Sequence, residues 1–170
     1  MSQNILKRSF YTRPTLEVAR DLLGKYLVFK SKAGKITEVE AYIGQDDKAC
    51  HAAGGKTKRN EVMFMKGGYA YVYLIYGLYH CLNVTTEKAG FPSAILIRAI
   101  DNPQANGPGK LCRYFGITRA HNGLDLTRSD LYIEDRGVII SANDIGQSKR
   151  IGVDYAGESA NLPWRFYLKS

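Results

Sequence analysis

The spacing of apolar residues changes once, early in the chain. Pro14 suits the first turn of a helix, and Gly24 stands where a C-terminal helix cap belongs. Between these two residues the apolar positions recur at the spacing of one helical face: Val18, Ala19, Leu22 and Leu23. The pattern predicts one helix over residues 14–23.

Beyond Gly24 the apolar residues recur with the period of two that is typical of strands. Tight turns are expected at residues 31–34 and at Tyr76-Gly77, and residues 62–66 are ambiguous. A short helix over residues 110–115 should follow the turn at residues 107–109. The expected strands are residues 26–30, 35–43, 69–75, 78–86, 94–100, 131–134, 138–141 and 164–168.

This order of elements predicts the fold class. One helix followed mainly by strands with hairpin-length gaps is typical of an α+β fold on an antiparallel sheet, rather than of repeated βαβ units. The 170 residues match the size of one ordinary domain, so we expect a single domain over residues 1–170. Hydrophobic residues make up 45%, which excludes the disordered class.

Charge and cysteine content narrow the function further. The net charge of +8 fits a polyanionic partner, either nucleic acid or an acidic membrane face. No apolar run approaches the ~20 residues of a membrane span, and no signal peptide is expected. The odd number of cysteines and the histidine spacing argue against a disulfide framework and a metal site. We therefore expect no metal or other cofactor, reduced thiols, and a cytoplasmic location of bacterial type.

Two glutamates are the first candidates for chemistry. On a strand, Glu38, Glu40 and Tyr42 share one face, and the opposite face is the expected core face. Neighbouring carboxylates on one face lie ~6–7 Å apart, so an acid/base pair is one interpretation. The alternative is a solvated strand face, the commoner arrangement for two glutamates.

Tyrosines are concentrated in one segment: five of the twelve lie within residues 69–79. A half-buried tyrosine-rich sheet face is the simpler explanation for most of them. Tyr76 differs because it falls at the tip of the expected hairpin, where its ring would be exposed. An exposed wedge on a basic protein suits insertion between stacked bases.

Cations form the third group of candidates. Lys58 and Arg59 lie in a basic loop after two glycines, and such a loop can neutralise a phosphate. Gly107 and Lys110 open the second expected helix, where backbone amides attract anions. Arg98 ends an apolar strand, a position where most arginines are structural.

Taken together, these motifs resemble the alkyladenine (3-methyladenine) DNA glycosylase family in order along almost the whole chain. The matching segments are residues 38–42, His51, 59–60, 63–65, 71–73, 76–77, 81–83, 96–99, 107–112, 150–157 and 163–167. The resemblance implies a single α+β domain around a curved, mostly antiparallel sheet, with flanking helices and a protruding hairpin that enters the minor groove. It also implies cleavage of the N-glycosidic bond of damaged purines.

The resemblance assigns roles to individual positions. Glu40 matches the glutamate that activates water, and Arg98 the arginine that helps to position that water and the DNA backbone. Tyr76 matches the residue that fills the gap in the duplex, and Asn83 the asparagine that discriminates against the amine of guanine. The residues that match the walls stacking on the extruded base are Tyr42, His51 and Tyr73.

The expected partner is double-stranded DNA containing damaged purines, with no membrane partner, and the expected state is a monomer associated with the nucleoid. No lysine is implicated as a Schiff-base nucleophile, so the expected product is an abasic site. The segment 100–106 is shorter than in many family members, which leaves out part of their DNA-backbone contact surface. Two alternatives stay open: a nucleic-acid-binding module without chemistry, and a small-substrate glycoside hydrolase that uses Glu38 and Glu40 as a pair.

Overall fold

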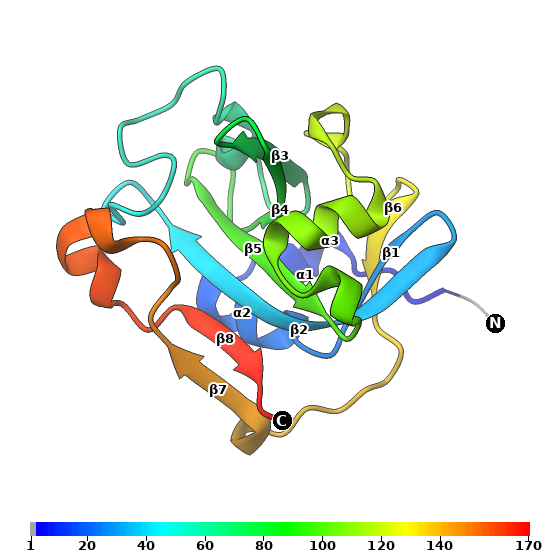
Figure 1. Ribbon diagram of the computed structural model, residues 1–170. Coiled ribbons are helices and arrows are strands. Elements are labelled where there is room, and N and C mark those ends of the chain that lie inside the picture. Colours follow the sequence, from blue (N-terminus) through cyan, green and yellow to red (C-terminus); the bar gives the residue numbers. More distant parts are fainter. Residues whose placement is uncertain (1–2) are drawn as a thin grey trace.

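A computed structural model describes residues 3–170 of the chain (Figure 1). Its α-helices are α1 (Arg8–Tyr11), α2 (Thr15–Leu22) and α3 (Pro108–Phe115). Its strands are β1 (Tyr26–Phe29), β2 (Lys32–Ile43), β3 (Ala70–Ile75), β4 (Tyr79–Thr85), β5 (Ser93–Ile100), β6 (Leu131–Glu134), β7 (Ile145–Ser148) and β8 (Arg165–Leu168). Short 3-10 helices are η1 (Glu61–Phe64), η2 (Pro103–Ala105), η3 (Arg119–His121), η4 (Ala142–Asp144) and η5 (Asp154–Asn161).

The eight strands form one antiparallel sheet that curls around the core (Figure 1). The main strand order is β3-β4-β5-β2-β1-β6, and β8 pairs with both β2 and β7. The long strand β2 pairs with β1 through residues 32–35 and with β5 through residues 36–43. A bulge between Ile36 and Val39 separates these two parts of β2. The predicted α+β class, with its curved antiparallel sheet, is confirmed.

Most predicted elements are present, with shifted ends. The helix expected over residues 14–23 is α2, and Gly24 follows it with a φ of 89°, a value that favours glycine. The ambiguous residues 62–66 belong mainly to η1. The short helix α1 was not predicted.

The strand expected over residues 138–141 is wrong. Val138 and Ile140 have the alternation of a strand, but that segment pairs with no strand of the described chain. Both side chains instead pack over Gly24, where a Cβ atom would lie 2.7 Å from Ile140. The two alternating side chains therefore make a packing contact instead of forming a strand, and the next strand, β7, begins at Ile145.

Strand β2 separates two apolar clusters, of which its alternation predicted only the first. Val39 and Ala41 lie in the larger cluster together with residues of α1, α2 and α3. Tyr42, on the other face, packs against a second cluster that includes Tyr71, Tyr73 and Leu96. This second face of the sheet carries the candidate site. No helix in residues 3–170 is long and apolar enough to span a bilayer.

Candidate active site

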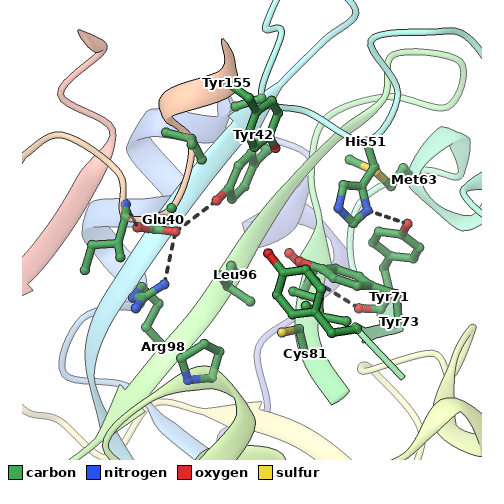
Figure 2. A pocket seen from close by; sticks show the side chains of 18 residues that line it. Glu40, Tyr42, His51, Met63, Tyr71, Tyr73, Cys81, Leu96, Arg98 and Tyr155 are labelled. Atoms are coloured by element: carbon green, nitrogen blue, oxygen red, sulfur yellow. Dashed lines mark hydrogen bonds and ion pairs between the residues drawn. The ribbon is translucent and has the colours of Figure 1, made fainter. Parts of the chain in front are cut away.

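A cavity of about 280 Å³ opens on the second face of the sheet (Figure 2). Strands β2, β3, β4 and β5 supply half of the residues that line it, and residues 151–155 close one side. Every residue that the family resemblance matched to catalysis, stacking or intercalation lines this cavity: Glu40, Tyr42, His51, Tyr73, Tyr76, Asn83 and Arg98. The chain brings them together from five separate segments.

Glu40 stands at one end of the cavity with a fully buried side chain. Its Oε1 accepts a hydrogen bond from the Tyr42 hydroxyl at 2.9 Å and forms an ion pair with Nη1 of Arg98 at 3.4 Å. Its Oε2 accepts a hydrogen bond from the backbone amide of Ile151 at 2.7 Å. For Glu40 the solvated-face interpretation is therefore wrong, because the curled sheet and residues 150–153 cover this part of β2.

Glu38 has a different environment. Its Oε2 accepts hydrogen bonds from Nε of Arg98 at 3.2 Å and from Nη1 of Arg165 at 2.9 Å. Glu38 does not line the cavity, and a fifth of its side chain is exposed. Arg98 thus joins the two glutamates, which occupy unequal positions. This inequality weighs against the paired-carboxylate hydrolase.

Aromatic side chains form the two walls of the cavity. Figure 2 shows Tyr42 on one side and His51, Tyr71 and Tyr73 on the other, with Leu96 between them. The His51 ring lies 4.2 Å from the Tyr73 ring, measured between centroids. A hydrogen bond of 2.9 Å joins Nδ1 of His51 to the Tyr71 hydroxyl and fixes the imidazole in place.

Burial keeps these walls uncharged near neutral pH. Desolvation, with a smaller contribution from Arg59, lowers the pKa of His51 below its usual value. Desolvation raises the pKa of Tyr71 to about 12, and it also raises the pKa of Tyr42, with nearby Glu40 adding to the effect. A planar guest would therefore meet neutral π faces, with Glu40 and Arg98 at one end.

Cys81 and Asn83 lie two residues apart on β4, and both line the cavity. Asn83 is buried, and its Nδ2 donates to the Tyr71 carbonyl at 3.3 Å. Burial raises the pKa of the Cys81 thiol to about 11, so the thiol is neutral. All three cysteines are free thiols, and no cluster suited to a metal occurs within residues 3–170.

Tyr76 is 89% exposed at the tip of the β3–β4 hairpin. Tyr76 and Gly77 have φ values of 54° and 66°, and the Leu78 amide donates to the Ile75 carbonyl at 2.9 Å. Ile75 pairs with Tyr79, so the connection has three residues rather than the two expected. The predicted exposure of Tyr76 is confirmed, and its ring is free to contact another molecule.

Apart from Arg98, the basic candidates lie outside the main cavity. Lys58 and Arg59 line a neighbouring groove beside β3, where Nη2 of Arg59 donates to the Leu74 carbonyl at 3.1 Å. Gly107 and Lys110 line a second groove beside the hairpin. The sequence predicted that the amides at this helix start could bind an anion. The Gly107 amide instead donates to the Arg98 carbonyl at 2.9 Å, so it is not available to an anion.

Sequence reasoning gave no role to several residues of the site. Tyr71 looked like ordinary sheet packing, and residues 151–155 entered only as part of the family resemblance. Asp47 and Arg150 form a buried ion pair behind the cavity, with 2.6 Å between Nη1 and Oδ2. Their separation of about one hundred residues leaves no local pattern that could have joined them.

Comparisons with known proteins show the family of this chain. Residues 9–170 match the family model described as methylpurine-DNA glycosylase (MPG). Three similar relatives are each named "Putative 3-methyladenine DNA glycosylase". The relative from Methanocella arvoryzae is 53% identical over 98% of this chain and 93% of its own length. Those from Sodalis glossinidius and Ehrlichia ruminantium (strain Welgevonden) are 60% and 49% identical, over 76% and 97% of this chain and 79% and 89% of their own lengths. The chain therefore belongs to the methylpurine-DNA glycosylase family and is a DNA glycosylase that acts in DNA repair.

Proposed function

We propose that this enzyme extrudes methylated purines, including 3-methyladenine, from duplex DNA and hydrolyses their N-glycosidic bond with a water molecule activated by Glu40. The observation that carries the proposal is a buried carboxylate at one end of a cavity with aromatic walls. A base inside a duplex is out of reach of such a cavity, so it must leave the stack at a cost of a few kcal/mol.

The walls fit a methylated purine better than a normal one. A base between Tyr42 and the His51–Tyr73 pair stacks on both sides. Methylation at N3 or N7 gives the purine a positive charge, which adds cation–π attraction to the stacking. Because the walls are neutral, this attraction is not opposed by a wall charge. Asn83, which lines the cavity with a buried side chain, is the residue we propose to discriminate against the exocyclic amine of guanine.

Glu40 supplies the acid–base chemistry. As the bond between C1′ and the base nitrogen breaks, its electron pair leaves with the base, and the sugar gains oxocarbenium character. The water oxygen bonds to C1′ and a water proton passes to Glu40. The donors from Tyr42, Ile151 and Arg98 complement the carboxylate anion and orient it. A methylated base is already a good leaving group, so this step needs no strong acid.

Three further observations support action on duplex DNA by one copy of the chain. Exposed Tyr76 can fill the vacated position in the stack, and the charge of +8 favours a polyanion. No lysine is among the cavity-lining residues of the described chain, which favours simple hydrolysis to an abasic site. One copy of the chain supplies every residue of the proposed mechanism, which supports a monomer.

The test is single-turnover base release from duplexes that carry one methylated purine or one hypoxanthine. Glu40→Gln should lower the rate by ~10²–10⁴, the usual contribution of a general base, and should still bind abasic-site DNA. Glu38→Gln is the matched control and should cost much less, because Glu38 contacts only arginines. Equal losses from both variants would favour the paired-carboxylate hydrolase. An unaffected Glu40→Gln variant would remove Glu40 from the mechanism, and binding without base release by the unsubstituted protein would favour a binding module.

A further inference from the structure

A buried arginine lies directly behind the cavity and takes no part in the mechanism above. Nη1 and Nη2 of Arg150 donate to Oδ2 and Oδ1 of Asp47 at 2.6 and 2.9 Å. The same two nitrogens donate to the Ala41 carbonyl at 2.9 Å and the Ser159 carbonyl at 2.9 Å. The side chains of Arg150 and Asp47 are 0% and 1% exposed. One guanidinium therefore links β2, the loop after β2, and η5.

The arginine is adjacent to two parts of the cavity. The residue after it, Ile151, gives its amide to Oε2 of Glu40 at 2.7 Å. The guanidinium carbon of Arg150 lies 4.8 Å from the centroid of the Tyr42 ring. Tyr42 in turn donates its hydroxyl to Oε1 of Glu40 at 2.9 Å. Arg150 thus supports one donor to each oxygen of the carboxylate.

A buried ion pair is a weak reason for stability by itself, because desolvation offsets much of the attraction between the charges. What the guanidinium provides is geometry, since its planar fork directs several donors at fixed angles. Asp47 is held as well: Oδ2 accepts from the Ile43 amide at 3.0 Å and Oδ1 from the Ala49 amide at 3.1 Å. The pair is therefore part of a hydrogen-bond network that holds β2, the loop after β2 and η5 together.

We propose that Arg150, held by Asp47, is a positioning residue for base release, which fixes the Ile151 amide on Glu40 and holds the ring of Tyr42 against the cavity. It acts through these residues and does not itself touch the base. The inference rests on the proposed role of Glu40.

Arg150→Lys is the first test. Lysine keeps the positive charge beside Asp47, but its single nitrogen cannot reproduce the fork that reaches Asp47, Ala41 and Ser159 together. On a duplex with one 7-methylguanine, single-turnover base release should fall about ten- to a hundred-fold, the loss expected for one hydrogen bond to a charged group. Binding to abasic-site DNA should change little.

The pH profile distinguishes positioning from a general loss of stability. A carboxylate that loses a backbone donor ionises less readily, so the acid limb of the rate profile should move to higher pH. The titratable and charged groups around Glu40 are not substituted in the variant, and among them only Tyr42 contacts Arg150, so a shift reaches Glu40 through Tyr42 or the Ile151 amide. These groups are Tyr42 and Glu38 on β2, Cys81 on β4, Arg98 on β5 and, through Glu38, Arg165 on β8.

Arg8→Lys is the matched control. Arg8 contacts Asp125 at 2.5 Å and the Gly67 carbonyl at 2.9 Å, and it does not line the cavity. This variant should lower the melting temperature without moving the pH profile. If Arg150→Lys fails to fold, the double variant Asp47→Asn/Arg150→Met removes both buried charges and should show the same slow rate and shifted profile.

The inference is overturned if a folded Arg150 variant releases base at the rate and with the pH profile of the unsubstituted protein. Failure of the proposed function has a different signature, because Glu40→Gln would then retain base release. A dead Glu40→Gln variant beside an unaffected Arg150→Lys variant would remove only the positioning role.

Discussion

Replacing Tyr76 by asparagine should stabilise the protein and weaken the enzyme. Tyr76 has a φ of 54°, in the left-handed region, and Gly77 follows it with a φ of 66°. Left-handed backbone costs an ordinary residue roughly 1–2 kcal/mol, whereas Asn-Gly is the pair that such turns prefer. The tyrosine ring is 89% exposed, so its removal forfeits little packing. A gain of about 1 kcal/mol would raise the melting temperature by roughly 2–4 °C for a chain of this size.

The same substitution removes the aromatic surface that we propose fills the vacated base position. Stacking on an aromatic side chain is worth about 1–3 kcal/mol, so single-turnover base release from a paired duplex should fall about five- to 150-fold. The loss should be smaller on a single-stranded substrate, in which no stack is held open. Thermal unfolding and single-turnover kinetics on both substrates measure the two effects. A lower melting temperature, or an unchanged rate on the duplex, would refute this reasoning.

Two further predictions concern charge. Lys58→Ala should weaken binding to damaged and undamaged duplexes alike. If Lys58 neutralises one phosphate, the slope of log K against log salt should become less negative by ~0.9. Binding titrations at several salt concentrations measure this slope, and an unchanged slope would mean that Lys58 contacts no phosphate. Burial opposes ionisation of Asp125, but hydrogen bonds from Thr127 and the Arg8 guanidinium outweigh it and hold its pKa below the usual value. Because the folded-state pKa is the lower one, the contribution of Asp125 to stability is present above the ordinary aspartate range and is lost as pH falls through the folded-state value. Asp125→Asn should therefore flatten the acid side of the stability profile, and an unaltered profile from denaturant unfolding would contradict this assignment.

The sequence predicted those features that depend on local pattern. Alternation on β2 placed Val39 and Ala41 in the core and Glu40 and Tyr42 on the opposite face, and the structure confirms that division. The exposure of Tyr76 followed from its place in a tight strand connection. These features need only near neighbours along the chain to decide them.

Features that depend on distant segments could not be read in the same way. The burial of Glu40 requires residues 150–153, which lie more than one hundred positions away. The sequence Ile145–Ser148 has little strand propensity, yet it becomes β7 because β8 offers it an edge. Val138 and Ile140 alternate like a strand but meet Gly24 instead of a neighbouring backbone. In each case the deciding partner is set by the tertiary fold.

The two sides of the cavity differ in how they are held. Glu40 lies in β2, which pairs with β5 on one edge and with β8 on the other, whereas residues 151–153 belong to no strand in the described chain. Amide protons in a doubly paired central strand exchange with solvent only through large-scale unfolding, while those of a loop exchange through local fluctuations. A guest base would therefore slow hydrogen exchange along residues 151–153 directly, by restricting local fluctuations, and would slow the exchange of β2 only through the stability that its binding adds to the folded state. The exchange rate of the Ile151 amide proton, which is hydrogen-bonded to Glu40, would therefore report whether a base occupies the cavity.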